Sequence, residues 1–547
     1  SSATQTITNG IDLTEGGLIW TKYRSGGLIS TSSHALIDTE RGGNKELSSD
    51  LIGAEQFTGA TQYFSFNNNG YTINSYYLAN AYTNLNNADF VSWTFRKAPK
   101  FFDIVTYTGN NGTQTINHNL GSVPGMIIVK RLNDAGHWGV KHRSIPATKG
   151  MFLNQTAATY TNSTYWGDTE PTSTQFTVSL TNSVDSAPYV AYLFAHNNND
   201  GEFGPSGDQD IIKCGSYTGD GGAGTTEVNL GFEPQWILVK ASSAADSWYI
   251  IDNMRGWGTH NNRANDAYLY ANATNAEATG GVLDITSTGF RTTLYSNANV
   301  NGREYIYMAI RRGPLAEPES ATNVFHVNTR TLNNSTISTN FAADMSLQAA
   351  TSFSGQDRFI EDRLRGFATD PSSTSGNAML KTNSTSAETS NQYPTVVNVF
   401  NNSYEEGNQN STLAAVTWMW KRAPGYFDVV AYTGQYNASG HNVAHNLGVA
   451  PEMMWIKSRD ASGNWVVYHK GTASDAETDF LTLNTTNAAS DNSSYWNDTA
   501  PTSTHFTVHT SAVVNSTGDK YIAYLFATAA GVSKVGSYTG DGTTGRV

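Results

Sequence analysis

An aromatic pair followed by a carboxylate occurs twice in this sequence and has the chemistry of a sugar site. Tyr165, Trp166 and Asp168 lie in YWGDTEPTSTQFTV (165–178), and Tyr495, Trp496 and Asp498 lie in YWNDTAPTSTHFTV (495–508). An aromatic face covers the apolar side of a pyranose while a nearby carboxylate accepts hydrogen bonds from its hydroxyls. These six residues are therefore the candidate glycan-binding residues. The alternative, which a strand–turn–strand pattern favours, is that the Trp packs between sheets and the Asp closes a turn.

Histidines in repeated contexts could form a metal site or an acid/base pair. His118 and His445 begin His-Asn-Leu-Gly turns, and His142 and His469 follow Trp-containing strands. The third copy of the turn has Val228 in place of the His, and no carboxylate recurs at a fixed offset beside both histidines. We therefore expect these histidines to stabilise turns or to pack, and we predict no metal ligands.

The motif Asp-x-x-Arg-Gly occurs three times after an apolar strand, with its pairs at Asp38/Arg41, Asp252/Arg255 and Asp362/Arg365. Such a pair can bridge a tight bend, and the Gly relieves backbone strain there. A catalytic carboxylate needs a partner in a cleft, and the motif offers none, so we expect a structural role.

The segment NNNDGEFGPSGDQD (197–210) is rich in oxygen ligands but lacks the spacing of an EF-hand loop. An exposed linker is the favoured interpretation, with a calcium site as the alternative. The sequence contains no phosphate-binding loop, nucleophile elbow or His-Glu-x-x-His helix. We accordingly predict a protein that is not an enzyme, with no catalytic residues and no cofactor.

The composition predicts short strands joined by turns. Charged residues make up 14% and aromatic residues 12% of the 547 residues, and 50 residues are Gly. The net charge of −13 argues against nucleic-acid binding, which needs a basic face. The single Cys214 excludes an intramolecular disulfide. The sequence contains no run of about 18 apolar residues, so we predict no membrane insertion.

Comparison of the chain with itself reveals an array. FVSWTFRKAP (90–99) is repeated as YIYMAIRRGP (305–314) and AVTWMWKRAP (415–424), and the same strand appears as YVAYLF (189–194) and YIAYLF (521–526). The equivalent positions are Trp93, Tyr192, Met308, Trp418 and Tyr524. They define module 1 (1–99), module 2 (100–198), an acidic, Gly-containing linker (199–212), module 3 (213–314), module 4 (315–424) and module 5 (425–531).

A second motif opens several modules, as VTYTGNNGTQTINHNLGSVPGMIIVK (105–130) and VAYTGQYNASGHNVAHNLGVAPEMMWIK (430–457) show. Its first half predicts a hairpin, and its apolar runs MIIVK and MMWIK predict strands that are buried on both faces. VGSYTGDGTTGRV (535–547) repeats the opening GSYTGDG of module 3. We therefore expect residues 532–547 to begin a sixth module and the natural protein to continue. Ser1 is not an initiator Met, so the start is expected to be processed or incomplete.

The repeated Tyr-Thr-Gly (107–109, 432–434), His-Asn-Leu-Gly (118–121, 445–448), Tyr-Trp-x-Asp-Thr (165–169, 495–499) and Tyr-x-Ala-Tyr-Leu-Phe motifs resemble a module of tail-fibre and virion proteins of marine bacteriophages. The resemblance covers nearly the whole chain, although modules 1, 3 and 4 depart more from the pattern. It implies an all-β fold of tandem antiparallel β-sandwich modules, jelly-roll and lectin-like, in an elongated array. It also implies a homo-oligomer, with a trimer as the first expectation.

The leading hypothesis is a structural and adhesion component of a phage virion, a tail fibre or surface fibre that touches host-surface polysaccharide weakly and repeatedly. Other virion proteins are its expected partners, and the particle surface or tail is its expected location. One alternative is a virion scaffold or decoration without a ligand. Another is a depolymerase tail spike with scattered carboxylates.

Overall fold

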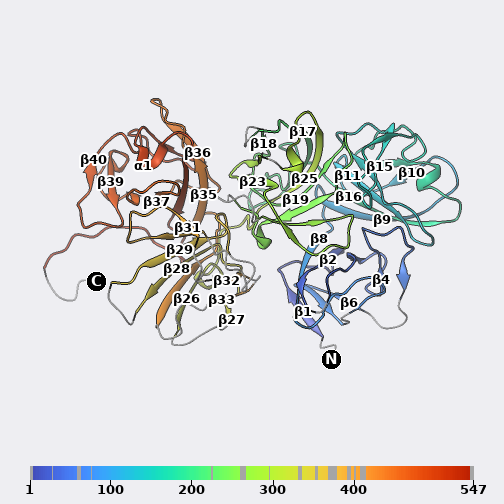
Figure 1. The fold of residues 1–547 in the computed structure, drawn as a ribbon, viewed down its shortest axis with the longest axis horizontal. Coiled ribbons are helices and arrows are strands. Elements are labelled where there is room, and N and C mark those ends of the chain that lie inside the picture. The colour runs from blue at the N-terminus through green and yellow to red at the C-terminus, as the bar shows by residue number, and fades with distance from the viewer. Residues whose placement is uncertain are drawn as a thin grey trace. The chain divides into compact units, whose positions relative to one another are not determined.

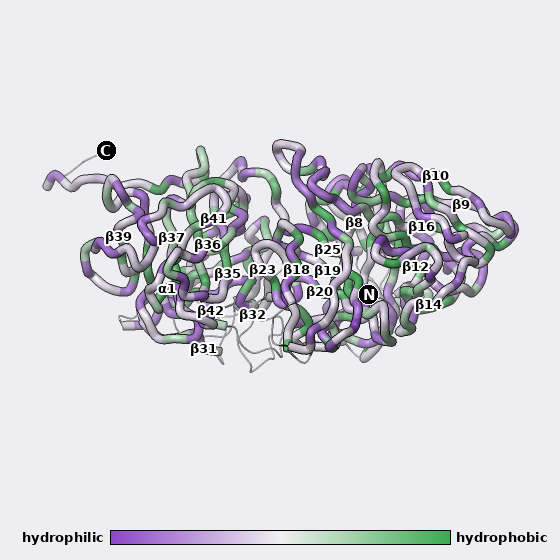
Figure 2. Tube along the Cα trace, turned by 90° about the horizontal axis from the view of Figure 1, so that it is seen from above, coloured by the Kyte–Doolittle hydropathy of each residue, from purple (hydrophilic) through white to green (hydrophobic). Residues whose placement is uncertain are grey.

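The computed structural model of the chain is built almost entirely from antiparallel β-sheets (Figure 1). It describes residues 4–27, 29–57, 63–74, 77–222, 226–258, 266–294, 296–330, 336–351, 355–367, 378–390, 396–399, 402–406 and 414–542. The expected all-β class is therefore confirmed. No described helix is long and apolar enough to cross a membrane. Figure 2 shows hydrophobic and hydrophilic residues interspersed along the chain.

Module 1 contains sheets of the order β3-β2-β8, β1-β7-β6 and β4-β5. Its strands are β1 (Gln5–Thr8), β2 (Gly17–Gly26), β3 (Ala35–Asp38), β4 (Lys45–Glu46), β5 (Gln56–Phe57), β6 (Phe64–Asn67), β7 (Gly70–Ile73) and β8 (Ala88–Arg96).

Module 2 contains sheets of the order β12-β11-β16-β9, β10-β15 and β13-β14. Its elements are β9 (Phe102–Thr108), β10 (Gln114–Asn117), β11 (Met126–Arg131), β12 (Gly139–His142), β13 (Lys149–Gly150), β14 (Tyr160–Thr161), β15 (Gln175–Val178), the 3₁₀ helix η1 (Leu180–Asn182) and β16 (Pro188–Phe194). The predicted opening hairpin is wrong, because β9 pairs with β16 whereas β10 pairs with β15 in another sheet.

Module 3 contains sheets of the order β17-β25-β19-β20-β21-β22 and β18-β24-β23. Its elements are β17 (Ile212–Thr218), β18 (Glu227–Asn229), β19 (Pro234–Ala241), β20 (Tyr249–Asp252), η2 (Asn253–Arg255), β21 (Ala267–Tyr270), β22 (Ala278–Thr279), β23 (Leu283–Thr286), β24 (Gly289–Thr292), η3 (Asn297–Asn299) and β25 (Glu304–Arg311).

Module 4 contains sheets of the order β26-β34-β28-β29-β30-β31 and β27-β33-β32. Its elements are η4 (Ala321–Asn323), β26 (Phe325–Arg330), β27 (Thr336–Ser338), β28 (Met345–Ala350), β29 (Arg358–Asp362), β30 (Ala378–Lys381), β31 (Thr389–Ser390), β32 (Val396–Val399), β33 (Ser403–Glu406) and β34 (Ala415–Trp420).

Module 5 contains sheets of the order β35-β42-β37-β38-β39-β40 and β36-β41. Its elements are β35 (Phe427–Thr433), β36 (His441–Ala444), β37 (Met453–Ser458), β38 (Val466–His469), η5 (Ala476–Thr478), β39 (Asp479–Thr482), β40 (Ser490–Asp491), β41 (His505–Val508), α1 (Ala512–Asn515) and β42 (Lys520–Phe526). The last residues of the expected sixth module, 543–547, lie outside the described residues.

The same strand register recurs in every module. The larger sheet pairs Trp20 with Trp93, Ile128 with Tyr192, Leu238 with Met308, Leu347 with Trp418 and Trp455 with Tyr524. These pairs reproduce the five positions that the repeats align. The register therefore gives the residues of these paired strands structural equivalents in the other modules.

The chain divides into two compact units. Unit 1 comprises Ser1–Arg255, Asn262–Asp284 and Phe290–Arg312, which is modules 1 to 3 without three short segments of module 3. Unit 2 comprises Gly256–Asn261, Ile285–Gly289 and Gly313–Val547, and it contains modules 4 and 5.

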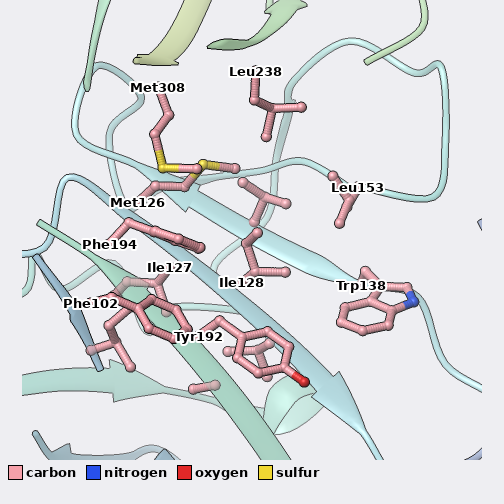
Figure 3. Close-up of a cluster of buried hydrophobic side chains, with 14 of the residues drawn as sticks. Phe102, Met126, Ile127, Ile128, Trp138, Leu153, Tyr192, Phe194, Leu238 and Met308 are labelled. Atoms are coloured by element: carbon pink, nitrogen blue, oxygen red, sulfur yellow. The ribbon is translucent and has the colours of Figure 1, made fainter. Parts of the chain in front are cut away.

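Modules 1, 2 and 3 share one apolar core. Module 1 keeps a cluster of its own between its sheets, which includes Ile19 and Phe64. The opposite face of its larger sheet, which includes Trp20, joins a cluster that runs through module 2 to Leu238 and Met308 of module 3. Figure 3 shows part of this cluster, with Met126 of module 2 beside Met308 and with Ile128 between Leu238 and Tyr192. The central strands of the larger sheets are thus covered on both faces, as predicted for MIIVK, whose residues are all buried.

Candidate functional site at the joints between modules

The predicted sugar residues are divided between the core and the surface. The indoles of Trp166 and Trp496 are each 1% exposed, and Trp496 donates its N–H to the Asp479 carbonyl across 2.9 Å. Asp168 and Asp498 are exposed on the turns that follow, with φ of 52° and 46°. The indoles offer no face to a pyranose ring in this structure, and the geometry matches the packing alternative.

The tyrosines beside these tryptophans also pack against the protein. Tyr165 is buried and makes an edge contact with Phe152 at a centroid distance of 5.5 Å. Tyr495 is half-buried and stacks on Phe480 at 4.0 Å. The two copies of the motif therefore present the same surface, a turn that carries one carboxylate.

His118 and His445 hold the turns that they begin, as predicted. The backbone N–H of Leu120 donates to His118 Nδ1 across 3.2 Å, and His118 Nε2 lies 3.2 Å from the Thr172 carbonyl. His445 makes the same contacts with Leu447 and with Thr502. Burial lowers the pKa of both histidines. Among the described residues, no group of His, Cys, Asp and Glu side chains is arranged to hold a metal ion.

The acidic segment 197–210 is a folded loop in which the carboxylates of Asp210 and Glu202 have partners within the protein. Asp210 accepts hydrogen bonds from the backbone N–H groups of Asn199 and Gly201 at 2.9 and 3.0 Å, and it lies 3.2 Å from Lys213. Glu202 lies 2.7 Å from Lys100. These contacts favour the linker interpretation.

The Asp-x-x-Arg-Gly motif forms the predicted bend in all three places. In module 1 the Arg41 backbone N–H donates to Asp38 Oδ1 across 2.9 Å, and Arg41 Nε donates to Asp38 Oδ2 across 2.6 Å. Gly42 follows with a φ of 95°, which a residue with a Cβ rarely adopts. The pairs Asp252/Arg255 and Asp362/Arg365 have the same bonds. The motif is thus a buried ion pair at the end of β3, β20 and β29.

The same buried pair contacts the aligned position of another module. Tyr192 of module 2 donates its hydroxyl to Asp38 Oδ2 across 2.7 Å, and Arg41 Nη2 lies 3.2 Å from that hydroxyl. Tyr524 of module 5 makes the equivalent bond to Asp362 of module 4 at 2.6 Å. Each motif therefore closes a bend and also binds a hydrogen-bond donor from a neighbouring module.

The motif of module 3 contacts a module that precedes it in the sequence. Trp93 of module 1 donates its indole N–H to Asp252 Oδ2 of module 3 across 3.0 Å. The Arg255 guanidinium lies 5.5 Å from the centroid of the same ring, in a cation–π contact. Module 1 thus binds module 2 through Asp38, and module 3 binds module 1 through Asp252.

A histidine replaces the motif where the neighbouring module has no donor. His142 ends β12 at the position of Asp38, and its Nε2 lies 3.0 Å from the Tyr307 carbonyl of module 3. The aligned residue there is Met308, which has no N–H or O–H side chain. Burial lowers the pKa of His142 to about 3, so its ring is neutral at pH 7. This contact between modules 2 and 3 completes a ring of three modules in unit 1.

Buried lysines repeat around the same ring. Each donates from Nζ to a backbone carbonyl of another module: Lys130 to Ile52 at 3.0 Å, Lys240 to Thr156 at 3.1 Å and Lys22 to Thr274 at 3.0 Å. Burial lowers the pKa of each to about 8. Because an unpaired buried ammonium is costly, these carbonyl contacts fix how the sheets meet.

The sequence profile of one family, described as "Domain of unknown function (DUF7483)", matches residues 1–314 and 321–546. The chain belongs to this family. Comparison with curated proteins gave no match, and comparison with solved structures gave none either.

For this DUF7483 chain, the joints are the site that sequence reasoning missed. The sequence shows both the Asp-x-x-Arg-Gly motif and the aligned strand positions. It did not indicate that the motif of one module contacts the aligned residue of another. The signal was present as a correlation: modules 1, 3 and 4 carry the motif and contact Tyr192, Trp93 and Tyr524, whereas module 2 carries His142 and contacts the Tyr307 carbonyl of a module whose aligned residue is Met308.

Proposed function

We propose that this protein is a non-catalytic structural component of a phage virion, built from jelly-roll-like β-sandwich modules that form a tail fibre or surface fibre. The observation that carries the proposal is the use of the repeated polar residues. Asp38, Asp252 and Asp362 each bind a side chain of another module instead of lining a cleft. An array whose recurring chemistry joins its own parts fits a load-carrying role.

The energetics of these joints support the same role. Removing one partner of a buried ion pair costs about 3–5 kcal/mol, because the other charge remains buried. Such pairs add less to net stability than to the choice of partner and register. Three modules that are locked in one register form a rigid building block, which a fibre or a particle surface needs.

Adhesion to host-surface polysaccharide remains part of the proposal in a reduced form. The burial of Trp166 and Trp496 removes the expected aromatic platform, whereas Asp168 and Asp498 occupy the same exposed turn in two modules. We therefore place assembly first and glycan contact second. A homo-oligomer, with three copies as the first expectation, remains to be measured by light scattering.

The test has two parts. Antibodies against residues 1–547 are applied to purified phage particles, and bound gold is located by electron microscopy while mass spectrometry counts the chain in the particle. We expect labelling at the tail or surface and no release of oligosaccharide from host polysaccharide by the purified chain. A chain that is absent from particles, or that releases oligosaccharides, would overturn the proposal.

A further inference from the structure

The ring of three modules in unit 1 has a partial counterpart in unit 2. Modules 4 and 5 meet as modules 1 and 2 do: Tyr524 binds Asp362, and Trp465 donates its indole N–H to the Lys381 carbonyl across 2.8 Å. The equivalent Trp138 of module 2 donates to the Ser48 carbonyl of module 1 across 3.0 Å. Among its described residues, unit 2 therefore shows one of the three joints that close the ring in unit 1.

The sheet of module 5 has one face that is less covered than its counterparts. In β11 of module 2, Met126 and Ile128 are buried against the shared core. The equivalent residues of β37 in module 5, Met453 and Trp455, are half-buried, although MMWIK was predicted to be covered on both faces. The residues that alternate with them, such as Met454, are fully buried. The less covered face of module 5 is thus equivalent to the face of module 2 that packs against the other modules of the ring in unit 1.

The loop after β39 shows the same difference. Leu153 of module 2, whose N–H donates to the Trp138 carbonyl, is 0% exposed within the shared core of unit 1 (Figure 3). Leu483 of module 5 donates in the same way to the Trp465 carbonyl but is 38% exposed. The two leucines have the same local structure, so their exposure differs because of what lies beyond the module.

Module 4 contributes the other half of this face. Trp418 is the equivalent of Trp93, which is 7% exposed against Asp252 and Arg255. Trp418 and its cross-strand neighbour Leu347 are half-buried. Leu347, Trp418, Met453, Trp455 and Leu483 together define what we call the open face of unit 2.

Residues that follow module 5 indicate what covers this face. Val535 is buried, and its backbone N–H donates to Thr528 Oγ1 across 3.0 Å. Cys214, at the start of module 3, donates in the same way to His196 Nδ1 across 3.1 Å. The sequence from Val535 repeats the opening of module 3, but Tyr538 is 88% exposed whereas its equivalent Tyr217 is 7% exposed and stacks on Tyr305.

The pairing of side chains around unit 1 specifies the type of module that fits. Module 5 ends β38 with His469. Its equivalent in unit 1, His142, contacts a module that has Met308 at the aligned position. Module 4 has Trp418 at the aligned position. Its equivalent in unit 1, Trp93, binds the Asp-x-x-Arg-Gly motif of module 3. A module of the module 3 type carries both features.

We infer that the open face of unit 2 binds a third module of the module 3 type, one that opens with the segment from Val535, which repeats the sequence of β17, and presents an Asp-x-x-Arg-Gly motif to Trp418. The inference concerns how modules assemble and does not depend on a virion role. Its failure would leave the proposed function to its own test.

The test supplies such a module from known sequence. Residues 1–542 are joined to a second copy of residues 222–312, and accessibility is probed with Leu483→Cys on the module 5 side and Thr351→Cys on the module 4 side. Thr351 is exposed, and the native Cys214 is buried and raises no background. Maleimide labelling is followed by intact mass. We expect both thiols to react roughly tenfold more slowly in the extended chain than in 1–547, because a covered thiol reacts only when the joint opens.

Two controls define the outcome. Thr499→Cys lies on an exposed turn after Trp496 and stays reactive in both chains. A second extension, a copy of residues 112–195, presents His142 to Trp418 and Tyr192 to His469, and we expect it to protect both thiols less. Unchanged labelling in the first extension, or an added copy that stays sensitive to protease, would overturn the inference. Protection already present in 1–547 would also overturn it, because a second copy of the chain would then be the occupant.

Discussion

Trp93 and Asp252 are 159 residues apart in the sequence, and the indole N–H of the first donates to the carboxylate of the second across 3.0 Å. This bond joins the closing strand of module 1 to the end of β20 in module 3. Together with the bond from Lys22 to the Thr274 carbonyl, it joins module 1 to module 3 and so closes the ring of three modules. Long-range closure of this kind orders the whole unit, because each module is then held on two sides.

The closing bond predicts a measurable loss of stability in Trp93→Phe. The substitution removes the N–H that Asp252 accepts while keeping an aromatic ring under Arg255. A hydrogen bond to a charged group contributes about 1.5–3 kcal/mol, and we expect a loss of that size in the free energy of unfolding by urea. The matched control is Trp418→Phe at the half-buried equivalent position, where we expect a loss below about 0.5 kcal/mol. Equal effects at the two sites would contradict the closing role.

The joint between modules 4 and 5 predicts a larger effect for Asp362→Ala. The change leaves Arg365 buried with Glu388 at 3.3 Å as its remaining carboxylate, and it removes the acceptor of the Tyr524 hydroxyl. We expect a loss of about 3–5 kcal/mol and faster hydrogen exchange in β42. Asp357→Ala, which breaks the partly exposed pair with Lys381, is the control and should cost less than about 1 kcal/mol. An undisturbed β42 in Asp362→Ala would count against the joint.

The all-β class could be predicted from the sequence, but the ring of modules could not. Periodicity shows that MIIVK is covered on both faces, yet it does not say which module covers the second face. The Asp38/Arg41 pair was assigned correctly to a bend because three residues of sequence contain the whole bend. The bond from Asp38 to Tyr192 joins residues that are 154 positions apart. A contact over that sequence separation leaves no local pattern from which a single sequence could predict it.

The burial of the tryptophans in the candidate sugar motif could not be predicted for a related reason. The same Trp-x-Asp sequence is compatible with an indole on the surface and with an indole between two sheets. The turn between the two residues lets their side chains point in different directions. The tight backbone at Gly167 and Asp168, with φ of 55° and 52°, turns the carboxylate outward after the buried Trp166. Residue type identified the chemistry, and only the packing decided its direction.

The buried position of Trp166 predicts that its removal affects folding before binding. We expect Trp166→Ala to lower the free energy of unfolding by about 3–5 kcal/mol, as truncation of a buried Trp does. Asp168→Ala, at the exposed turn, should change stability by less than about 0.5 kcal/mol. Both are measured by urea unfolding beside binding to host polysaccharide. A Trp166→Phe variant of normal stability that loses glycan binding would restore the sugar platform.

The neutral His142 predicts that unit 1 loses stability in acid. Burial lowers its pKa from 6.5 to about 3, with Lys141, Arg143 and His196 also disfavouring the charged ring. Between these two values the unfolded chain binds a proton that the folded chain does not, so the free energy of unfolding falls as the pH falls from about 6.5 toward 3. The contribution of this one residue at pH 4, relative to pH 7, is about 3 kcal/mol.

The measurement compares wild type with His142→Gln, whose amide can still donate toward the Tyr307 carbonyl but does not titrate. Urea unfolding at pH 7, 5.5 and 4 gives two curves, and the acid loss of the variant should be smaller by about the stated amount. His34, His118 and His196 also have lowered pKa values, but they are present in both proteins, so most of their contribution cancels in the difference. Parallel curves would mean that the joint between modules 2 and 3 tolerates a protonated His142, either because the ring is solvated there or because the two modules separate before the chain unfolds.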